Sequence, residues 1–192
     1  WRGSWEHEGG GVIGNQAPHQ FDLLCWYMGE VAEVYGRWAN INHPYIEVDD
    51  SAVATVLFKS GGLASIFVSN SQRPGIYAKV HIHGSSGASA GVQTDGGAMF
   101  IAGRSSVLEA PYNDIWTIPG QEECRAQWQK EDEEFFSHID ATWYFFAQQE
   151  EDFARAILEG QALSVSGSDG LQVARIIEGI YRSNREGVPI RN

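Results

Sequence analysis

Apolar residues recur at helical spacing near the start of the chain. Phe21, Leu24, Cys25 and Met28 stand at positions i, i+3, i+4 and i+7, and Gly29 follows them. This spacing puts the four side chains on one face of a helix, and a glycine directly after such a stripe commonly ends it. The pattern therefore predicts an amphipathic helix that ends at Gly29.

After this helix the chain changes to short segments rich in β-branched and aromatic residues, which are typical of strands. A Gly-rich link, Ser60-Gly61-Gly62, separates two of these segments and is short enough for a hairpin, so we expect that pair to be antiparallel. Residues 84–103 are mainly Gly, Ser and Ala, which indicates tight turns, one weak strand and an exposed loop. The predicted strands are 32–41, 51–59, 62–69 and 77–83.

Helical spacing returns after Gly120, first at Phe146, Phe153 and Ile157, and Gly160 is expected to end that helix. A last helix is predicted over residues 168–183, with polar caps before it and a glycine and a proline after it. The order of one helix, several strands and further helices indicates an α+β fold. In the last helix we expect Ser168 and Asp169 as caps, Val173, Ile177, Ile180 and Tyr181 as the buried stripe, and Gly187 with Pro189 beyond its end.

The length, net charge and cysteine content of the chain exclude several classes of protein. A chain of 192 residues is the size of one domain, so residues 1–192 are expected to form a single domain. The first residue is Trp1 rather than Met, so we expect a fragment or a processed product whose missing N-terminus could have carried a signal peptide. A net charge of -12 opposes binding to nucleic acid. Two cysteines, Cys25 and Cys124, imply no disulfide framework, and the longest apolar runs are shorter than the roughly 20 residues of a membrane helix. A cytoplasmic location fits these features.

Several motifs of known chemistry are absent from the sequence. No strand is followed by Gly-x-Gly-x-x-Gly, and the glycines at 9–11 follow the charged stretch Glu6-His7-Glu8 instead of a strand. No Gly-x-Ser-x-Gly elbow or His-Glu-x-x-His pair occurs either. We therefore expect no cofactor-binding residues in this chain.

The segment from Gly9 to Asp22 carries the strongest candidate chemistry. Asn15, His19 and Asp22 are spaced at i, i+4 and i+7, so a continuous helix would align them along one side. An imidazole exchanges a proton near neutral pH, an amide binds a hydroxyl, and the glycines at 9–11 let a substrate approach the backbone. The alternative is that His19 and Asp22 satisfy buried backbone groups and that the glycines form a loop.

Four other residues are weaker candidates for binding a ligand. Arg2 and Trp5 could supply an anion or hydroxyl contact and a face for a sugar, although Trp5 could equally pack in the core and Arg2 be solvated. His81 and His83 share one face of a predicted strand, but no third ligand stands at a suitable spacing, so polar contacts are expected there and no metal site. Asp49 and Asp50 are expected to cap or turn the chain into the predicted strand 51–59.

The segment from Gly9 to Asp22 resembles the family of glucose-fructose oxidoreductase and inositol dehydrogenase, called Gfo/Idh/MocA, whose pattern is Gly-Gly-Gly, an acid or amide, then His and Asp. The resemblance extends from Trp5 essentially to the end of the chain. The agreeing stretches are 47–52, 59–62, 152–157 and 180–183 with Gly187.

This resemblance implies a two-domain enzyme, in which a Rossmann domain binds NAD or NADP and a C-terminal domain has an open, mainly antiparallel sheet with helices packed on one face. Only the second domain is expected here, and alone it is expected to be inactive. His19 matches the family's histidine and is expected to be a general acid/base, assisted by a lysine of the missing domain. Asn15 stands where many members carry Asp, so it is assigned as a substrate hydroxyl ligand, with Gln16 as a weaker neighbour.

The resemblance also implies a sugar or polyol substrate and a homo-oligomer. The strand segments carry apolar residues at both alternations, such as Val53, Val56 and Phe58 beside Ala54 and Leu57, which favours pairing of two sheets. Two other functions remain open. A non-catalytic sugar-sensing or regulatory member would fit the amide at Asn15, and a stand-alone sugar-binding or hydrolytic domain would need paired carboxylates or a metal cluster.

Overall fold

The computed structural model describes residues 2–71, 77–96 and 112–192, and these form two compact units. The first unit comprises Trp1–Ile76 together with Gly167–Asn192, and the second comprises Tyr77–Ser166. Each unit contains one antiparallel sheet, so the α+β fold with open antiparallel sheets is confirmed, although the strands divide between two sheets. No helix in the described ranges is long and apolar enough to cross a membrane.

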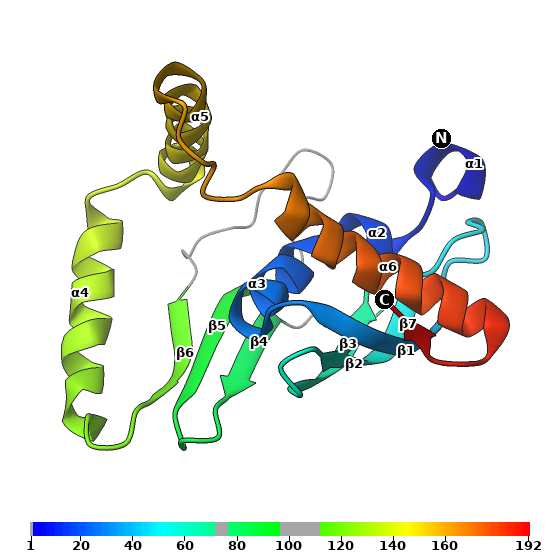
Figure 1. Ribbon diagram of the computed structural model, residues 1–192, viewed down its shortest axis with the longest axis horizontal. Coiled ribbons are helices and arrows are strands. Elements are labelled where there is room, and N and C mark those ends of the chain that lie inside the picture. Colours follow the sequence, from blue (N-terminus) through cyan, green and yellow to red (C-terminus); the bar gives the residue numbers. More distant parts are fainter. Residues whose placement is uncertain (1, 72–76, 97–111) are drawn as a thin grey trace. The chain divides into compact units, whose positions relative to one another are not determined.

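The sheet of the first unit has four antiparallel strands in the order β3-β2-β1-β7 (Figure 1). The predicted hairpin is confirmed, since Leu57 lies opposite Leu63 and Gly61 adopts a φ of 87° in the turn between them. The last strand pairs with β1 over two residues and was not predicted. The strands are β1 (Val31–Ala39), β2 (Ser51–Phe58), β3 (Leu63–Ser69) and β7 (Ile190–Arg191).

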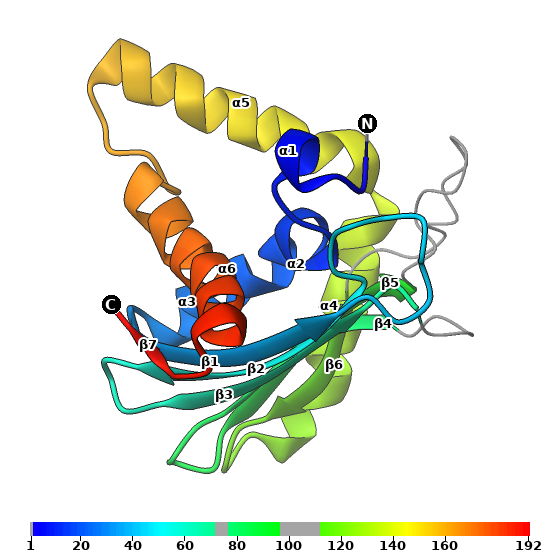
Figure 2. The same ribbon diagram turned by 90° about the vertical axis from the view of Figure 1, so that its right-hand side faces the viewer.

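Helices α2, α3 and α6 lie on the same face of this sheet (Figure 2). The predicted amphipathic helix is α3, in which Phe21 and Cys25 are buried, and the N–H of Gly29 donates to the carbonyl of Cys25 at its end. The last helix, α6, begins one residue before the predicted start, so the two expected cap residues lie inside its first turn. The helices of this unit are α1 (Trp5–Glu8), α2 (Val12–Asn15), α3 (Pro18–Met28) and α6 (Gly167–Glu186).

The buried stripe of α6 differs from the predicted one. Val173 and Ile180 are buried as expected, whereas Ile177 and Tyr181 are only partly buried and the centre of the contact includes Ile176. The reason is the close approach of α6 to β1, because a Cβ on Gly179 would lie 2.7 Å from the Cβ of Val34. Small residues therefore face the sheet here, and a search for large apolar residues misplaces the buried face.

The core of the first unit lies between the sheet and these helices. From Ala52 onward β2 alternates, with Ala54, Val56 and Phe58 buried and the residues between them exposed. The large apolar side chains that are almost fully removed from solvent come from α2, α6, the two central strands and the loop before β2: Ile13, Val31, Val34, Val48, Val56, Phe58, Ile176 and Ile180.

The second unit contains the sheet β4-β5-β6 and three helical segments. The predicted strand 77–83 is β4, and the weak strand expected in 84–103 is β5, while residues 97–103 lie outside the described part. The helix predicted around Phe146 and Phe153 is α5, and it ends before Gly160, whose φ is 68°. The elements are β4 (Tyr77–His83), β5 (Ser89–Gly96), β6 (Tyr112–Thr117), η1 (Glu122–Cys124), α4 (Arg125–Ser137) and α5 (Ala141–Glu159).

Candidate functional site

The candidate residues lie where α2 passes into α3. The backbone stays right-handed through Gln16 (φ -98°, ψ -40°) and Ala17 (φ -63°, ψ -26°), and the N–H of Ala17 donates to the carbonyl of Val12. Pro18 has no N–H to continue the ladder, which is tolerated at the first position of a helix. The expected continuous helix is therefore two short helices joined at Gln16 and Ala17, with Asn15 ending one and His19 in the first turn of the other.

The side chains of Asn15, Gln16, His19 and Asp22 are all exposed. The amide of Gln16 donates to the Oδ1 of Asn15 at 3.0 Å. The exposure of His19 and Asp22 disagrees with the alternative that these two side chains satisfy buried backbone groups. An exposed imidazole and an exposed pair of amides on adjoining helical turns can together donate to, and accept from, the hydroxyls of a ligand.

The first turn of α2 is held by Asp49, whose side chain is fully buried. Its carboxylate accepts the N–H of Gly11 at 2.8 Å and that of Ile13 at 2.9 Å, and its carbonyl accepts the N–H of Val12 at 3.1 Å. The first N–H groups of a helix have no partner within the helix, and a carboxylate there also matches the positive end of the helix dipole. Asp49 thus caps α2 from a distant loop, because Gly11 at the N-cap position has no side chain to do so.

Asp49 also accepts a hydrogen bond from the last helix, α6. The hydroxyl of Tyr181 in α6 donates to the Oδ1 of Asp49 at 2.7 Å. Burial, and then the hydrogen bond to the nearby Asp49 carboxylate, raise the pKa of Tyr181 well above its usual range, so the phenol remains a hydrogen-bond donor. The orientation of α2 therefore depends on both the loop before β2 and the helix α6.

The glycines at 9–11 have structural roles that the sequence analysis did not assign. A Cβ on Gly10 would lie 2.3 Å from the hydroxyl of Tyr181, and one on Gly11 would lie 1.9 Å from the carbonyl oxygen of Asp49. Gly9 adopts a φ of 73° at the end of α1. The space beside Gly10 and Gly11, where a substrate was expected to approach the backbone, is thus occupied by Tyr181 and Asp49.

Trp5 is largely engaged within the protein. Its indole N–H donates to the carbonyl of Glu47 at 3.1 Å, and its ring packs against Trp38 and Tyr181 with centroid separations of 5.4 and 5.3 Å. About a third of the residue stays accessible, at 37% exposure. Most of the Trp5 ring therefore packs against the protein, as in the alternative to sugar contact. Arg2, three residues earlier, is exposed.

The histidines of β4 belong to the second unit. The Nδ1 of His83 is hydrogen-bonded to the hydroxyl of Ser89 at 2.8 Å, which is a polar contact of the expected kind. Among the described residues, no three His, Cys, Asp or Glu side chains come together in a way that could hold a metal ion.

Comparison with known proteins adds a second line of evidence. The sequence matches the family model of the GFO/IDH/MocA C-terminal domain over residues 1–90. An uncharacterized oxidoreductase, YrbE of Bacillus subtilis, is 27% identical over 94% of this chain and 48% of its own length.

Solved structures show the same fold. The WlbA dehydrogenase from Bordetella pertussis, in complex with NADH and UDP-GlcNAcA, superposes with a TM-score of 0.74 at 25% identity over 100% of this chain and 50% of its own. The aldose-aldose oxidoreductase from Caulobacter crescentus superposes with a TM-score of 0.64 at 21% identity over 96% of this chain and 48% of its own. This chain thus spans about half the length of the relatives that it matches.

Proposed function

We propose that this chain is a C-terminal domain of the Gfo/Idh/MocA oxidoreductase family, as its similarities to known proteins support, and that it is the substrate-facing half of an NAD(P)-dependent enzyme that oxidises or reduces a CH–OH group of a sugar or polyol. The observation that carries this proposal is the exposed trio of Asn15, Gln16 and His19 at the junction of α2 and α3, with the start of α2 held by Asp49. Residues 1–192 would then act as one substrate-binding and oligomerisation domain.

The cofactor would be held mainly by the part of the full-length protein outside this chain. The glycines of this chain do not form a cradle for a dinucleotide, since Gly10 and Gly11 lie against Tyr181 and Asp49. Relatives such as WlbA are solved with NADH, which supports NAD or NADP as the cofactor. When bound, its nicotinamide ring accepts or returns a hydride; the residues of this chain would bind and orient the substrate and move its proton.

His19 is proposed as the general acid/base. As the reacting carbon is oxidised, its hydroxyl must lose a proton, and an imidazole can accept that proton near neutral pH. The side chain is exposed and forms no hydrogen bond with any described residue, so both ring nitrogens are accessible to a substrate. In the reverse direction the imidazolium would return the proton to the carbonyl oxygen.

Asn15 and Gln16 are proposed as hydroxyl ligands. An amide cannot act as a base, and it can both donate to and accept from a hydroxyl. The bond from Gln16 to Asn15 leaves the Asn15 amide nitrogen to donate to the substrate. Arg2 and the accessible edge of Trp5 would contact more distant parts of the sugar.

The open face of the first sheet supports the proposal of a homo-oligomer. Helices cover one face, and the other exposes apolar side chains from three adjacent strands. Exposed apolar patches of this kind commonly mark protein interfaces. The residues concerned are Tyr35, Val53, Leu57, Leu63 and Phe67, with exposures of 39%, 51%, 38%, 77% and 56%.

The test is turnover by the full-length protein, measured as cofactor reduction with NAD and NADP across a panel of polyols, aldoses and nucleotide sugars. We expect one class of sugar to be oxidised, and His19→Ala to react at least about a hundredfold more slowly. His138→Ala is the matched control, because His138 is also exposed but lies at the end of α4 in the second unit. Turnover by the 192-residue chain alone would contradict the proposed division between two halves.

A thermal-shift measurement with the same ligands distinguishes an enzyme from a non-catalytic, sugar-sensing member of the family. If cofactor and sugar stabilise the full-length protein but no sugar is turned over, the chain belongs to a sugar-sensing member, in agreement with the amide at Asn15. If neither stabilises it, both functions are excluded.

A further inference from the structure

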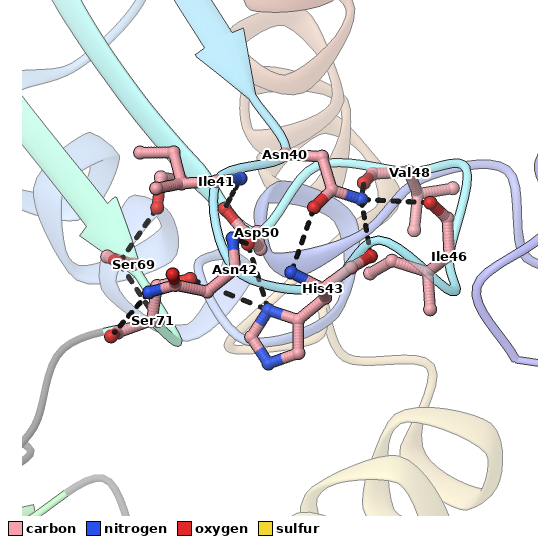
Figure 3. Close-up of polar contacts among 10 residues, drawn as sticks. Asn40, Ile41, Asn42, His43, Ile46, Val48, Asp50, Ser69 and Ser71 are labelled. Atoms are coloured by element: carbon pink, nitrogen blue, oxygen red, sulfur yellow. Dashed lines mark hydrogen bonds and ion pairs between the residues drawn. The ribbon is translucent and has the colours of Figure 1, made fainter.

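A second buried carboxylate lies next to Asp49 in the sequence. Asp50 is fully buried and accepts hydrogen bonds from the N–H of Ile41 at 2.9 Å, the N–H of Asn42 at 2.7 Å and the Nδ1 of His43 at 2.9 Å (Figure 3). Burial acts to raise the pKa of Asp50, but these hydrogen bonds, with one from Ser71, together hold it well below its usual range. Asp50 is therefore a carboxylate at neutral pH.

The backbone around His43 is fixed by Asn40. The Oδ1 of Asn40 accepts the N–H of His43 at 3.1 Å, and its amide donates to the carbonyls of His43 and Ile46, each at 2.9 Å (Figure 3). A hydrogen-bonded turn from Ile46 back to His43 completes this arrangement. His43 is thus held at its backbone by one side chain and at its ring by another.

The contact with Asp50 fixes the chemistry of the His43 ring. A carboxylate only accepts hydrogen bonds, so the Nδ1 of His43 carries the proton and the neutral ring keeps a lone pair on Nε2. The side chain is 23% exposed, and Figure 3 shows Nε2 pointing away from the hydrogen-bond network. Tyr45 lies beside it with a ring separation of 5.7 Å and an interplanar angle of 80°, and it is 80% exposed.

The hydrogen bond to Asp50 does not by itself require a histidine at position 43. The carboxylate already accepts two backbone N–H groups, and a simple hydroxyl or amide could donate the bond that His43 supplies. A histidine adds a second ring nitrogen, which the loop directs outward. An oriented hydrogen-bond acceptor beside an exposed aromatic ring suits a sugar, which presents hydroxyls along its edge and C–H groups on its face.

The loop of residues 40–50 is attached to the proposed substrate site on two sides. Asp49 holds the start of α2 through the N–H groups of Gly11 and Ile13, four and two residues before Asn15. Glu47 donates its N–H to the carbonyl of Gly3 at 2.7 Å and accepts the indole N–H of Trp5. The loop that carries His43 therefore has a fixed position relative to both groups of proposed ligand contacts.

We propose that His43 is a further substrate-binding residue, oriented by Asp50 so that its Nε2 accepts a hydrogen bond from a hydroxyl of the sugar or polyol, with Tyr45 packing beside the bound ring. This proposal rests on the proposed function and extends it, because it assigns a second imidazole to binding while His19 serves proton transfer. Nothing in this role requires His43 to exchange a proton with the substrate.

The decisive variant is His43→Asn in the full-length protein. Asparagine keeps a donor close to the position of Nδ1, so the bond to Asp50 is preserved, but it lacks Nε2. For the sugar that the wild type turns over, we expect the KM to rise about tenfold, with kcat changed less than about twofold, as for the loss of one neutral hydrogen bond to the substrate. The KM for the cofactor should not change, and His138→Asn should leave all three constants unaltered. An unchanged KM for the sugar in a folded His43→Asn protein would overturn the proposal.

A second measurement keeps this test separate from that of the proposed function. The ¹⁵N resonance of the His43 Nε2 in the full-length protein, loaded with cofactor, is recorded with myo-inositol, glucose and UDP-GlcNAcA. A shift that is absent in the presence of sodium chloride at the same concentration supports binding at His43 even if no sugar is turned over. If none of these compounds moves the resonance and no sugar is turned over, the proposal fails together with the enzyme assignment.

Discussion

Tyr181 and Asp49 are 132 residues apart in the sequence and are joined by a hydrogen bond of 2.7 Å, which links α6 to the cap of α2. Asp49 in turn receives the N–H groups of Gly11 and Ile13. Two side chains with no proposed contact to the substrate thus hold the start of α2, which ends at Asn15 and leads into the first turn of α3 with His19. The position of the candidate site therefore depends on buried contacts that do not touch the substrate.

Removal of the Tyr181 hydroxyl should weaken this connection while keeping the aromatic packing. In Tyr181→Phe the ring can still contact Trp5, but a buried carboxylate oxygen loses one of its donors. We expect the free energy of unfolding to fall by about 1–2 kcal/mol. Urea denaturation measures it, with Tyr27→Phe as the control because Tyr27 is exposed on α3. Equal effects of the two variants would contradict the role given to the hydroxyl.

An alanine at position 11 should be poorly tolerated. Its Cβ would lie 1.9 Å from the carbonyl oxygen of Asp49, and the three nearest atoms all belong to the Asp49 backbone, which cannot rotate away as a side chain can. We expect Gly11→Ala to destabilise the protein by about 2 kcal/mol or more, in the range of strained backbone substitutions.

Gly14→Ala is the natural comparison for that substitution. Gly14 lies in α2, is exposed, and a Cβ there would meet its nearest neighbour only at 4.0 Å. Alanine is the better helix former, so this variant should be neutral or more stable by up to about 1 kcal/mol. Thermal melts of the two variants side by side give the answer, and similar losses in both would show that the contact with Asp49 is unimportant.

Acid should destabilise the protein in part through Asp50. Its pKa is lower in the folded protein than in the unfolded chain, so its contribution to stability is present above the ordinary carboxyl pKa and is lost as the pH falls below it. We expect the free energy of unfolding to decrease from about pH 4 downward, and this decrease to be shallower in Asp50→Asn. Urea titrations at a series of pH values test this, with the exposed Asp22→Asn as control. An acid dependence of the same slope in Asp50→Asn would refute it.

The open sheet face should be the site of self-association. Phe67 on β3 lies opposite Val53 on β2, and both are more than half exposed on that face. We expect Phe67→Glu to convert a dimer into single chains, since a charge would be buried in an apolar contact. Light scattering measures the mass, and Trp26→Glu is the control because Trp26 is exposed on α3 instead. A wild-type mass equal to one chain at micromolar concentration would exclude the interface.

Features that depend on local spacing were predicted well from the sequence. The stripe of Phe21 and Cys25 correctly gave α3, and the hairpin at Gly61 gave the pairing of β2 with β3. Those signals arise from neighbours along the chain. The break between α2 and α3 was also visible in principle, because Pro18 cannot donate to a continuing helix, but the regular spacing of Asn15 and His19 concealed it.

Features that depend on distant contacts could not be predicted in this way. The pairing of Asp49 with Tyr181 joins two residues whose local patterns give no sign of each other. The buried face of α6 was wrong by part of a turn because Gly179 and Ser183, which are small, allow the close approach to β1. The orientation of His43 by Asp50 likewise results from the path of the loop between β1 and β2, which spacing alone does not determine.

The first unit is assembled from the two ends of the sequence, and this has a consequence for synthesis on the ribosome. Strand β1 is covered by α6, with Gly36 donating its N–H to the Ser183 hydroxyl at 3.1 Å, and it is bordered by β7. When residues 31–39 emerge, the helix that covers them has not yet been made. The nascent chain must therefore leave the part of the apolar sheet face that α6 covers exposed while residues 77–166 are translated, which makes this step sensitive to aggregation and a point at which chaperones would act.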